Sequence, residues 1–252
     1  MERIKLPDTY TERPPADELD VSSRIHSRFK KIGQVMPESQ RTIYESLVEM
    51  MREDVKRYRG YPKTIHKPTV SDVGCGCGIG SNILSHEAQF VWGIDINEES
   101  INYARQMFAR EPNNIYYTPQ ISFDHLNIID DPREVMGFDY VVCVEVIEHL
   151  PSAQSLSFLQ GLNRLFKKDK QGNTLQNEER TTLYLTTPNR NSPLIQDDTP
   201  RNEHHCFEPT PGEMYEFLTS HYRHVTILNQ HLKPVDLDTT DTPLVYKLEI
   251  PQ

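Results

Sequence analysis

A glycine-rich run and two acidic residues have the types and spacing of a ligand-binding site. Asp72 is followed by a run with glycine at every second position, and Asp95 lies 21 residues after the first of these glycines. The three glycines of the run are Gly74, Gly76 and Gly78. Glycine permits the positive φ values and the close backbone approach that a ligand-binding turn requires. The spacing therefore predicts a turn built to receive a small molecule.

The charges around this turn indicate which small molecule it receives. A carboxylate about twenty residues after such a turn can accept hydrogen bonds from both hydroxyls of a ribose, which suits Asp95. The sequence has neither the glycine spacing of a dinucleotide site nor a Gly-Lys-Ser/Thr phosphate loop. Asp72 would repel a pyrophosphate and attract a cation. We therefore expect a nucleoside with a charged tail that is not a phosphate.

A second group of residues suited to chemistry follows two later apolar runs. Glu145, Glu148 and His149 come directly after the first of these runs. His205 lies in a long polar segment after the second. Carboxylates and imidazoles can take a proton from an acceptor or ligate a divalent cation. We expect Glu145, His149 and His205 to be catalytic. The segment after the second run also contains further candidates for a base, which are Asn189, Arg190, His204 and Glu208.

Parallel strands joined by helices would bring these residues together. From residue 69 onward, short apolar runs alternate with helical patterns, which is typical of an α/β protein with a doubly wound sheet. The predicted strands are 69–73, 90–95, 121–123, 140–144, 181–186, 225–229 and 244–250. The predicted helices between them are 80–87, 98–110, 152–166 and 211–221. Ligands bind at the carboxyl ends of the strands in such sheets. We expect a mostly parallel seven-stranded sheet with helices on both faces, its last two strands being antiparallel neighbours.

The residues before the sheet divide into two parts. Residues 1–20 contain three prolines and few apolar residues, which predicts an extended or disordered arm. Residues 21–67 predict a helical extension, because apolar residues recur at helical spacing from 38 to 59. Residues 22–67 carry 11 Lys or Arg against 5 Asp or Glu, a basic segment that could contact nucleic acid. The remaining residues, 68–252, are predicted to form one catalytic domain.

Composition limits the class of protein. The 252 residues carry a net charge of −10, and 36% of them are hydrophobic, as in ordinary globular proteins. Apolar stretches of the ~18 residues that cross a membrane are absent from the sequence, and so is an apolar leader. We therefore expect a cytoplasmic protein with no membrane association.

Three motifs in family order resemble the class I S-adenosylmethionine-dependent methyltransferases, in particular those of ubiquinone biosynthesis. The motifs are the loop 72–80, the carboxylate Asp95 and the segment 138–150. The resemblance implies S-adenosylmethionine as the cofactor and methyl transfer to an oxygen or nitrogen of a small or sugar-like acceptor. It implies that the cofactor is bound by Asp72, Gly74, Gly76, Gly78, Asp95, Ile96, Asn127, Ile128 and Glu145. Asn127 stands where the family usually has an acidic residue beside the adenine.

Two other functions remain open. Glu145, Glu148, His149 and His205 also resemble the Glu-x-x-Glu-His and later His pattern of metal-dependent 2′-O-methyltransferases acting on small-RNA 3′ ends. In that case the four side chains would hold a divalent cation, whereas our prediction is a site without metal. The net charge of −10 speaks against nucleic acid. The other alternative is a non-catalytic module that binds the cofactor or a partner protein.

Overall fold

The computed structural model describes residues 36–57, 67–109, 120–131, 133, 135, 137–176, 179–194 and 204–251. The predicted arm 1–20 lies outside the described residues, and so do 22–35 and 58–66 of the basic segment 22–67. Within the described part of the chain, no helix is both long and apolar enough to span a membrane.

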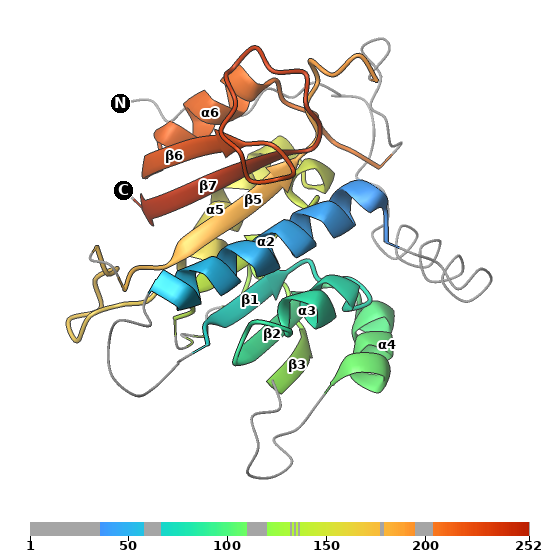
Figure 1. The fold of residues 1–252 in the computed structure, drawn as a ribbon, viewed down its shortest axis with the longest axis vertical. Helices are drawn as coiled ribbons and strands as arrows, with labels where there is room; N and C mark the ends of the chain where they lie inside the picture. The colour runs from blue at the N-terminus through green and yellow to red at the C-terminus, as the bar shows by residue number, and fades with distance from the viewer. Residues whose placement is uncertain are drawn as a thin grey trace.

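A seven-stranded sheet with the order β3-β2-β1-β4-β5-β7-β6 forms the centre of the structure (Figure 1). Strands β1 to β5 pair in parallel, and β7 is antiparallel to both β5 and β6. The strands are β1 (Thr69–Val73), β2 (Phe90–Asp95), β3 (Gln120–His125), β4 (Tyr140–Cys143), β5 (Thr182–Thr187), β6 (Tyr222–Leu228) and β7 (Leu244–Pro251). The predicted fold class and the antiparallel relation of the last two strands are confirmed.

Helices cover both faces of the sheet because the strands bury side chains on both sides. Helices α2, α3 and α4 share one apolar cluster with β1, whereas α5 and α6 belong to the cluster on the opposite face. Successive strand residues point to opposite faces, so Val70 lies in the first cluster and Val73 in the second. The helices are α2 (Glu38–Arg57), α3 (Ile79–Leu84), α4 (Glu98–Phe108), α5 (Ser155–Asn163) and α6 (Pro211–Thr219).

Helix α2, which precedes the sheet in the chain, is part of the layer that covers it. Figure 1 shows α2 running across the sheet beside β1. Ile43, Leu47 and Met51 are fully buried in the cluster that also contains β1, β4 and β5 side chains. The Tyr140 hydroxyl of β4 donates to Asp54 of α2 at 2.8 Å. Apolar packing and this bond fix the helix on the strands that lead to the candidate site.

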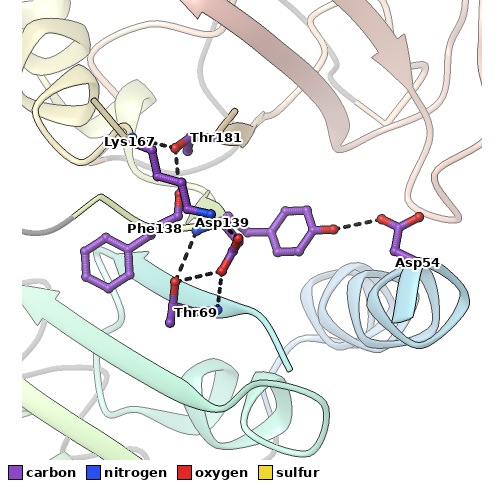
Figure 2. A network of polar contacts seen from close by, with 7 residues as sticks. Asp54, Thr69, Phe138, Asp139, Lys167 and Thr181 are labelled. Carbon is purple, nitrogen blue, oxygen red and sulfur yellow. Dashed lines mark hydrogen bonds and ion pairs between the residues drawn. The ribbon is translucent and has the colours of Figure 1, made fainter. Parts of the chain in front are cut away.

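Polar contacts join the amino ends of β1, β4 and β5, away from the candidate site (Figure 2). Asp139 accepts from the Thr69 amide at 2.8 Å and the Thr69 hydroxyl at 2.9 Å, and it forms an ion pair with Lys167. The Lys167 amide donates to the Thr181 hydroxyl at 2.8 Å, which in turn donates to the Phe138 carbonyl at 2.6 Å. These contacts fix the start of three neighbouring strands.

Replacing Asp139 with Asn should remove a pH-dependent part of the stability. Burial opposes ionisation, but Lys167 and Thr69 outweigh it and hold the pKa of Asp139 below its usual value. A lowered folded-state pKa adds stability above the unfolded pKa, and this stability is lost as the pH falls through the folded value. We expect D139N to unfold at a lower temperature at pH 7. The free energy of unfolding should fall by about 1 kcal/mol, as for a partly exposed group. In thermal unfolding the difference should shrink between pH 5 and 3; an equal difference throughout would contradict this assignment.

Candidate active site

The glycine run forms a tight turn between β1 and α3, fixed to the end of β2. Gly74, Gly76 and Gly78 have φ values of 74°, 52° and 80°, which other residues rarely adopt. The amides of Gly74 and Cys75 both donate to the Ile94 carbonyl, at 2.8 and 3.1 Å. The predicted turn is therefore present, and its hydrogen bonds hold it against the neighbouring strand.

The three glycines meet different surroundings. A Cβ atom on Gly74 would lie 2.3 Å from Val146, and one on Gly78 would lie 2.8 Å from Phe123. These two positions are closed by the protein's own side chains. A Cβ on Gly76 would meet no atom within 4 Å. The turn is therefore open at Gly76, where a ligand can reach the backbone.

Asp95 lies beside this opening at the end of β2. Its carboxylate accepts from the Gly76 amide and from the Asn97 amide, both at 2.8 Å. Burial raises the pKa of Asp95, although these backbone donors oppose the rise. Each carboxylate oxygen has a further lone pair that can accept from a ribose hydroxyl. The next residue, Ile96, is 37% exposed and offers an apolar surface for a base.

Asp72 is directed into the protein instead of toward open space. Its side chain is fully buried, and it accepts from the hydroxyls of Tyr44 at 3.1 Å and Ser81 at 2.7 Å. Burial raises the pKa of Asp72 to about 6, against the effect of these two donors. The predicted attraction on a cationic ligand would therefore act through intervening groups. Neither donor is among the residues predicted from the sequence. Tyr44 comes from α2 without any motif, whereas Ser81, three residues after Gly78, could have been found from its position.

Asn127 and Ile128 follow β3 and are engaged in the protein's own contacts. The Asn127 side chain accepts from the Ile129 amide at 3.0 Å and donates to Asp130 at 2.6 Å. Ile128 is buried, and its carbonyl accepts from Arg164. Their adenine contact stays a prediction, and the Asn127 amide would have to leave its local bonds to form it.

Glu145 follows β4 in a left-handed conformation, with a φ of 56°. Its amide donates to the Thr186 hydroxyl at 2.9 Å, and that hydroxyl donates to Glu145 Oε1 at 2.8 Å. Such a conformation costs roughly 1 kcal/mol or more in a non-glycine residue and clusters at functional sites. Its neighbour Val146 packs against Gly74. The segment after β4 thereby adjoins the glycine turn.

Three of the four residues in the metal pattern come together. One potential ligand atom each from Glu148, His149 and His205 lie within 4.8 Å of one another. Glu145 is not part of this group, and one of its oxygens is bound to Thr186. A carboxylate with two imidazoles is a suitable ligand set for a borderline divalent cation.

The Glu148 carboxylate is buried without a hydrogen-bond partner among the described residues. Glu148 is fully buried, and neither of its side-chain oxygens has a hydrogen-bond partner among the described residues. Burial and the nearby charge of Glu145 raise the pKa of Glu148 well above its usual value. An unpaired charge in such a place is costly unless a proton or a cation compensates it. The residues present therefore fit a bound cation.

Backbone contacts hold the two histidines face to edge. The Cys206 amide donates to the Glu148 carbonyl at 2.7 Å, which fixes the segment around His205 on the turn around His149. The two rings meet edge to face with centroids 4.7 Å apart. Burial, together with His205, lowers the pKa of His149 to about 4. His149 is therefore neutral near pH 7 and can accept a proton or ligate a cation.

Residues 70–169 match the family model described as a methyltransferase domain. This match supports the class I S-adenosylmethionine-dependent methyltransferase family for the chain. The family predicted from the three motifs is confirmed. Ubiquinone biosynthesis O-methyltransferase of Haemophilus ducreyi is 32% identical to the chain over 121 residues, which cover 48% of this chain and 45% of that protein. The chain spans less than half the length of the curated relatives that it matches.

Two solved structures show the same fold at low sequence identity. A TehB-like SAM-dependent methyltransferase from Corynebacterium glutamicum is 14% identical, with a TM-score of 0.52 over 95% of this chain and 100% of that one. The small RNA methyltransferase HEN1 is 18% identical, with a TM-score of 0.54 over 81% of this chain and 25% of that one. At these identities the likeness concerns the fold alone.

Replacing Tyr44 with Phe should weaken the cofactor turn through Asp72. The change removes one of two hydroxyl donors to a buried carboxylate, which costs about 1–3 kcal/mol. We expect a lower unfolding temperature and weaker binding of S-adenosylhomocysteine by calorimetry. Tyr140→Phe is the matched control, because it removes a hydroxyl bond to the same helix away from the turn. Equal affinity in both variants would show that Tyr44 serves stability only.

Replacing Glu148 with Gln should stabilise the cation-free protein. A folded-state pKa raised above the unfolded value means that stability is lost as the pH rises through the raised value. Glutamine has no such loss, so the advantage of E148Q in thermal unfolding with chelator should grow from pH 5 to 9. Glu213→Gln is the control, and it should destabilise the protein where E148Q stabilises it. Thr210 and Arg190 outweigh burial and lower the pKa of Glu213, so the ionised carboxylate contributes stability that glutamine removes. A destabilised E148Q would show that the carboxylate is compensated within the protein.

Proposed function

We propose that the chain transfers the methyl group of S-adenosylmethionine to a hydroxyl oxygen of a sugar-like acceptor. The observation that carries this proposal is the opening at Gly76 with the carboxylate of Asp95 hydrogen-bonded beside it. This arrangement suits a ribose at Asp95, a base on Ile96 and the rest of the nucleoside along the turn. The name of the Haemophilus ducreyi relative, an O-methyltransferase, supports oxygen as the acceptor atom.

The cluster of Glu148, His149 and His205 supports the choice of a hydroxyl. In place of the site without metal that the sequence led us to expect, we infer that these residues would hold a divalent cation, for which the orphaned Glu148 carboxylate is the main support. When bound, such a cation supplies positive charge that orients a hydroxyl and eases the loss of its proton. The chain's remaining task is to align the acceptor oxygen with the methyl group.

The chemistry is one displacement with a balanced proton transfer. The cofactor supplies an electrophilic methyl group on a sulfonium sulfur. As the carbon–oxygen bond of the product forms, the carbon–sulfur bond breaks, leaving S-adenosylhomocysteine and a methyl ether. The hydroxyl proton passes to a neutral imidazole or to solvent. His149, which stays neutral near pH 7, is suited to take it where it is not a ligand.

A second candidate is methylation of the 2′-hydroxyl at RNA 3′ ends. The observation that favours it is the same cluster, since a terminal ribose offers two adjacent hydroxyls to a cation. The name of the HEN1 structure, a small RNA methyltransferase, agrees with this acceptor. The net charge of −10 speaks against a large nucleic-acid surface, so the terminal sugar would have to supply most of the recognition.

The first test is calorimetry with S-adenosylhomocysteine, using wild type, Asp95→Asn and Asp124→Asn. We expect D95N to weaken binding roughly ten- to hundredfold, as for lost hydrogen bonds to a charged group. D124N changes a carboxylate at the end of the adjacent strand and should bind like wild type. Unchanged affinity in D95N would refute the ribose assignment.

The second test is a transfer assay with radiolabelled S-adenosylmethionine, with and without Mn²⁺ or Mg²⁺. The acceptors are small diols, an oligoribonucleotide with a free 3′ end and its 3′-terminal 2′-deoxy counterpart. Labelling of the ribonucleotide but not of the deoxy form would select the RNA acceptor, and labelling of diols alone would select a small molecule. Cofactor binding without any transfer would favour the non-catalytic alternative. Transfer that is unchanged by a chelator would refute the cation.

A further inference from the structure

Both histidines of the cluster use the same ring nitrogen for a partner outside it. Nδ1 of His205 lies 2.6 Å from Glu208 Oε1, and Nδ1 of His149 lies 3.3 Å from the His204 carbonyl oxygen. A carbonyl or a carboxylate oxygen accepts, so each Nδ1 carries the hydrogen. A neutral imidazole has only one ring hydrogen, which leaves a lone pair on Nε2 of each ring. Glu208 and the His204 carbonyl therefore favour the same tautomer in both rings, with the hydrogen on Nδ1.

Glu208 is held in a fixed place relative to His205. Its side chain is fully buried, and the residue before it, Phe207, is packed into the apolar core. The Cys206 and Phe207 amides donate to the Glu148 carbonyl at 2.7 and 3.4 Å. The chain between His205 and Glu208 is thus fixed on the turn that carries Glu148. The two side chains that form the Nδ1–Oε1 contact therefore start from a fixed backbone.

Glu208 is separate from the group of potential ligands. That group, searched among the described residues, comprises Glu148, His149 and His205. The Oε1 atom of Glu208 instead contacts Nδ1 of His205, which leaves Nε2 as the ring nitrogen that can ligate. Carboxylates in this relation to a histidine fix its ring orientation and raise its basicity as a ligand.

We propose that Glu208 is a positioning residue, which holds His205 with Nδ1–H on Oε1 so that Nε2 is presented to a cation shared with Glu148 and His149. The inference rests on the proposed function, because it requires that cation. It assigns Glu208 a role through His205, in place of the role of a base that its position in the polar segment first suggested.

The test compares Glu208→Gln and Glu208→Ala with wild type. Glutamine can still accept from Nδ1–H through its oxygen, whereas alanine cannot. We expect E208A to weaken Mn²⁺ binding about 10- to 100-fold and E208Q to recover most of that loss. Binding is measured by calorimetry and by the electron paramagnetic resonance signal of free Mn²⁺. In ¹⁵N spectra of the imidazoles without Mn²⁺, E208A should lose the single Nδ1–H form of His205 that E208Q retains.

Glu213→Gln is the matched control for the local fold. Glu213 caps α6 five residues later through Thr210 and pairs with Arg190, without a bond to either imidazole. E213Q should lower the unfolding temperature and leave Mn²⁺ affinity unchanged. S-adenosylhomocysteine affinity, measured on all variants, reports whether the rest of the site has kept its structure.

The outcomes separate this inference from the proposed function. Wild-type binding of Mn²⁺ with equal affinity in E208A, or an unchanged His205 spectrum in that variant, would overturn the role of Glu208 alone. Equal losses in E208A and E213Q would also overturn it, because the effect would then be one of the local fold. Failure of wild type to bind Mn²⁺ would overturn the cation of the proposed function and this inference with it.

Discussion

The parallel pairing of β1 with both β2 and β4 is the constraint on which the site depends. The strand order reverses at this point, so the segments after β1, β2 and β4 emerge together at one edge of the sheet. The glycine turn, the carboxylate of Asp95 and the strained Glu145 all lie on these segments. The amide bonds from Gly74 and Cys75 to the Ile94 carbonyl then lock the turn to its neighbour. The remaining side chains are positioned relative to this edge.

Three fully buried carboxylates near the candidate site differ in their hydrogen-bond partners. Asp72 is satisfied by two hydroxyls, and Glu208 is paired with the imidazole of His205. Glu148 has no side-chain hydrogen-bond partner within the described residues. Since burial penalises each ion, the carboxylate of Glu148 requires a proton or a cation to compensate its charge. The other two carboxylates shape the groups around them.

Much of the fold could be predicted from local patterns. The strands β1 and β2 have the predicted bounds, and the Thr210–Glu213 capping box begins α6 at Pro211 as its residues indicate. The predicted helix 152–166 is shorter, with a 3₁₀ turn (Ser152–Gln154) before α5. Helix ends depend on packing and capping, which periodicity does not specify. The position of α2 on the sheet could not be predicted from its apolar stripe. Such a stripe indicates that one face of the helix is buried, but not which surface it packs against.

By itself, the sequence determined the fold class, the family and the position of the cofactor turn, because strand periodicity, glycine spacing and the place of Asp95 are local properties. Only the tertiary structure decided that Asp72 bonds to Tyr44, that Glu145 turns toward Thr186 and that Glu148 meets His149 and His205. These contacts join residues from separate elements, or depend on how a turn directs a side chain. Their geometry follows from strand order, burial and backbone hydrogen bonds, which no spacing along the chain encodes.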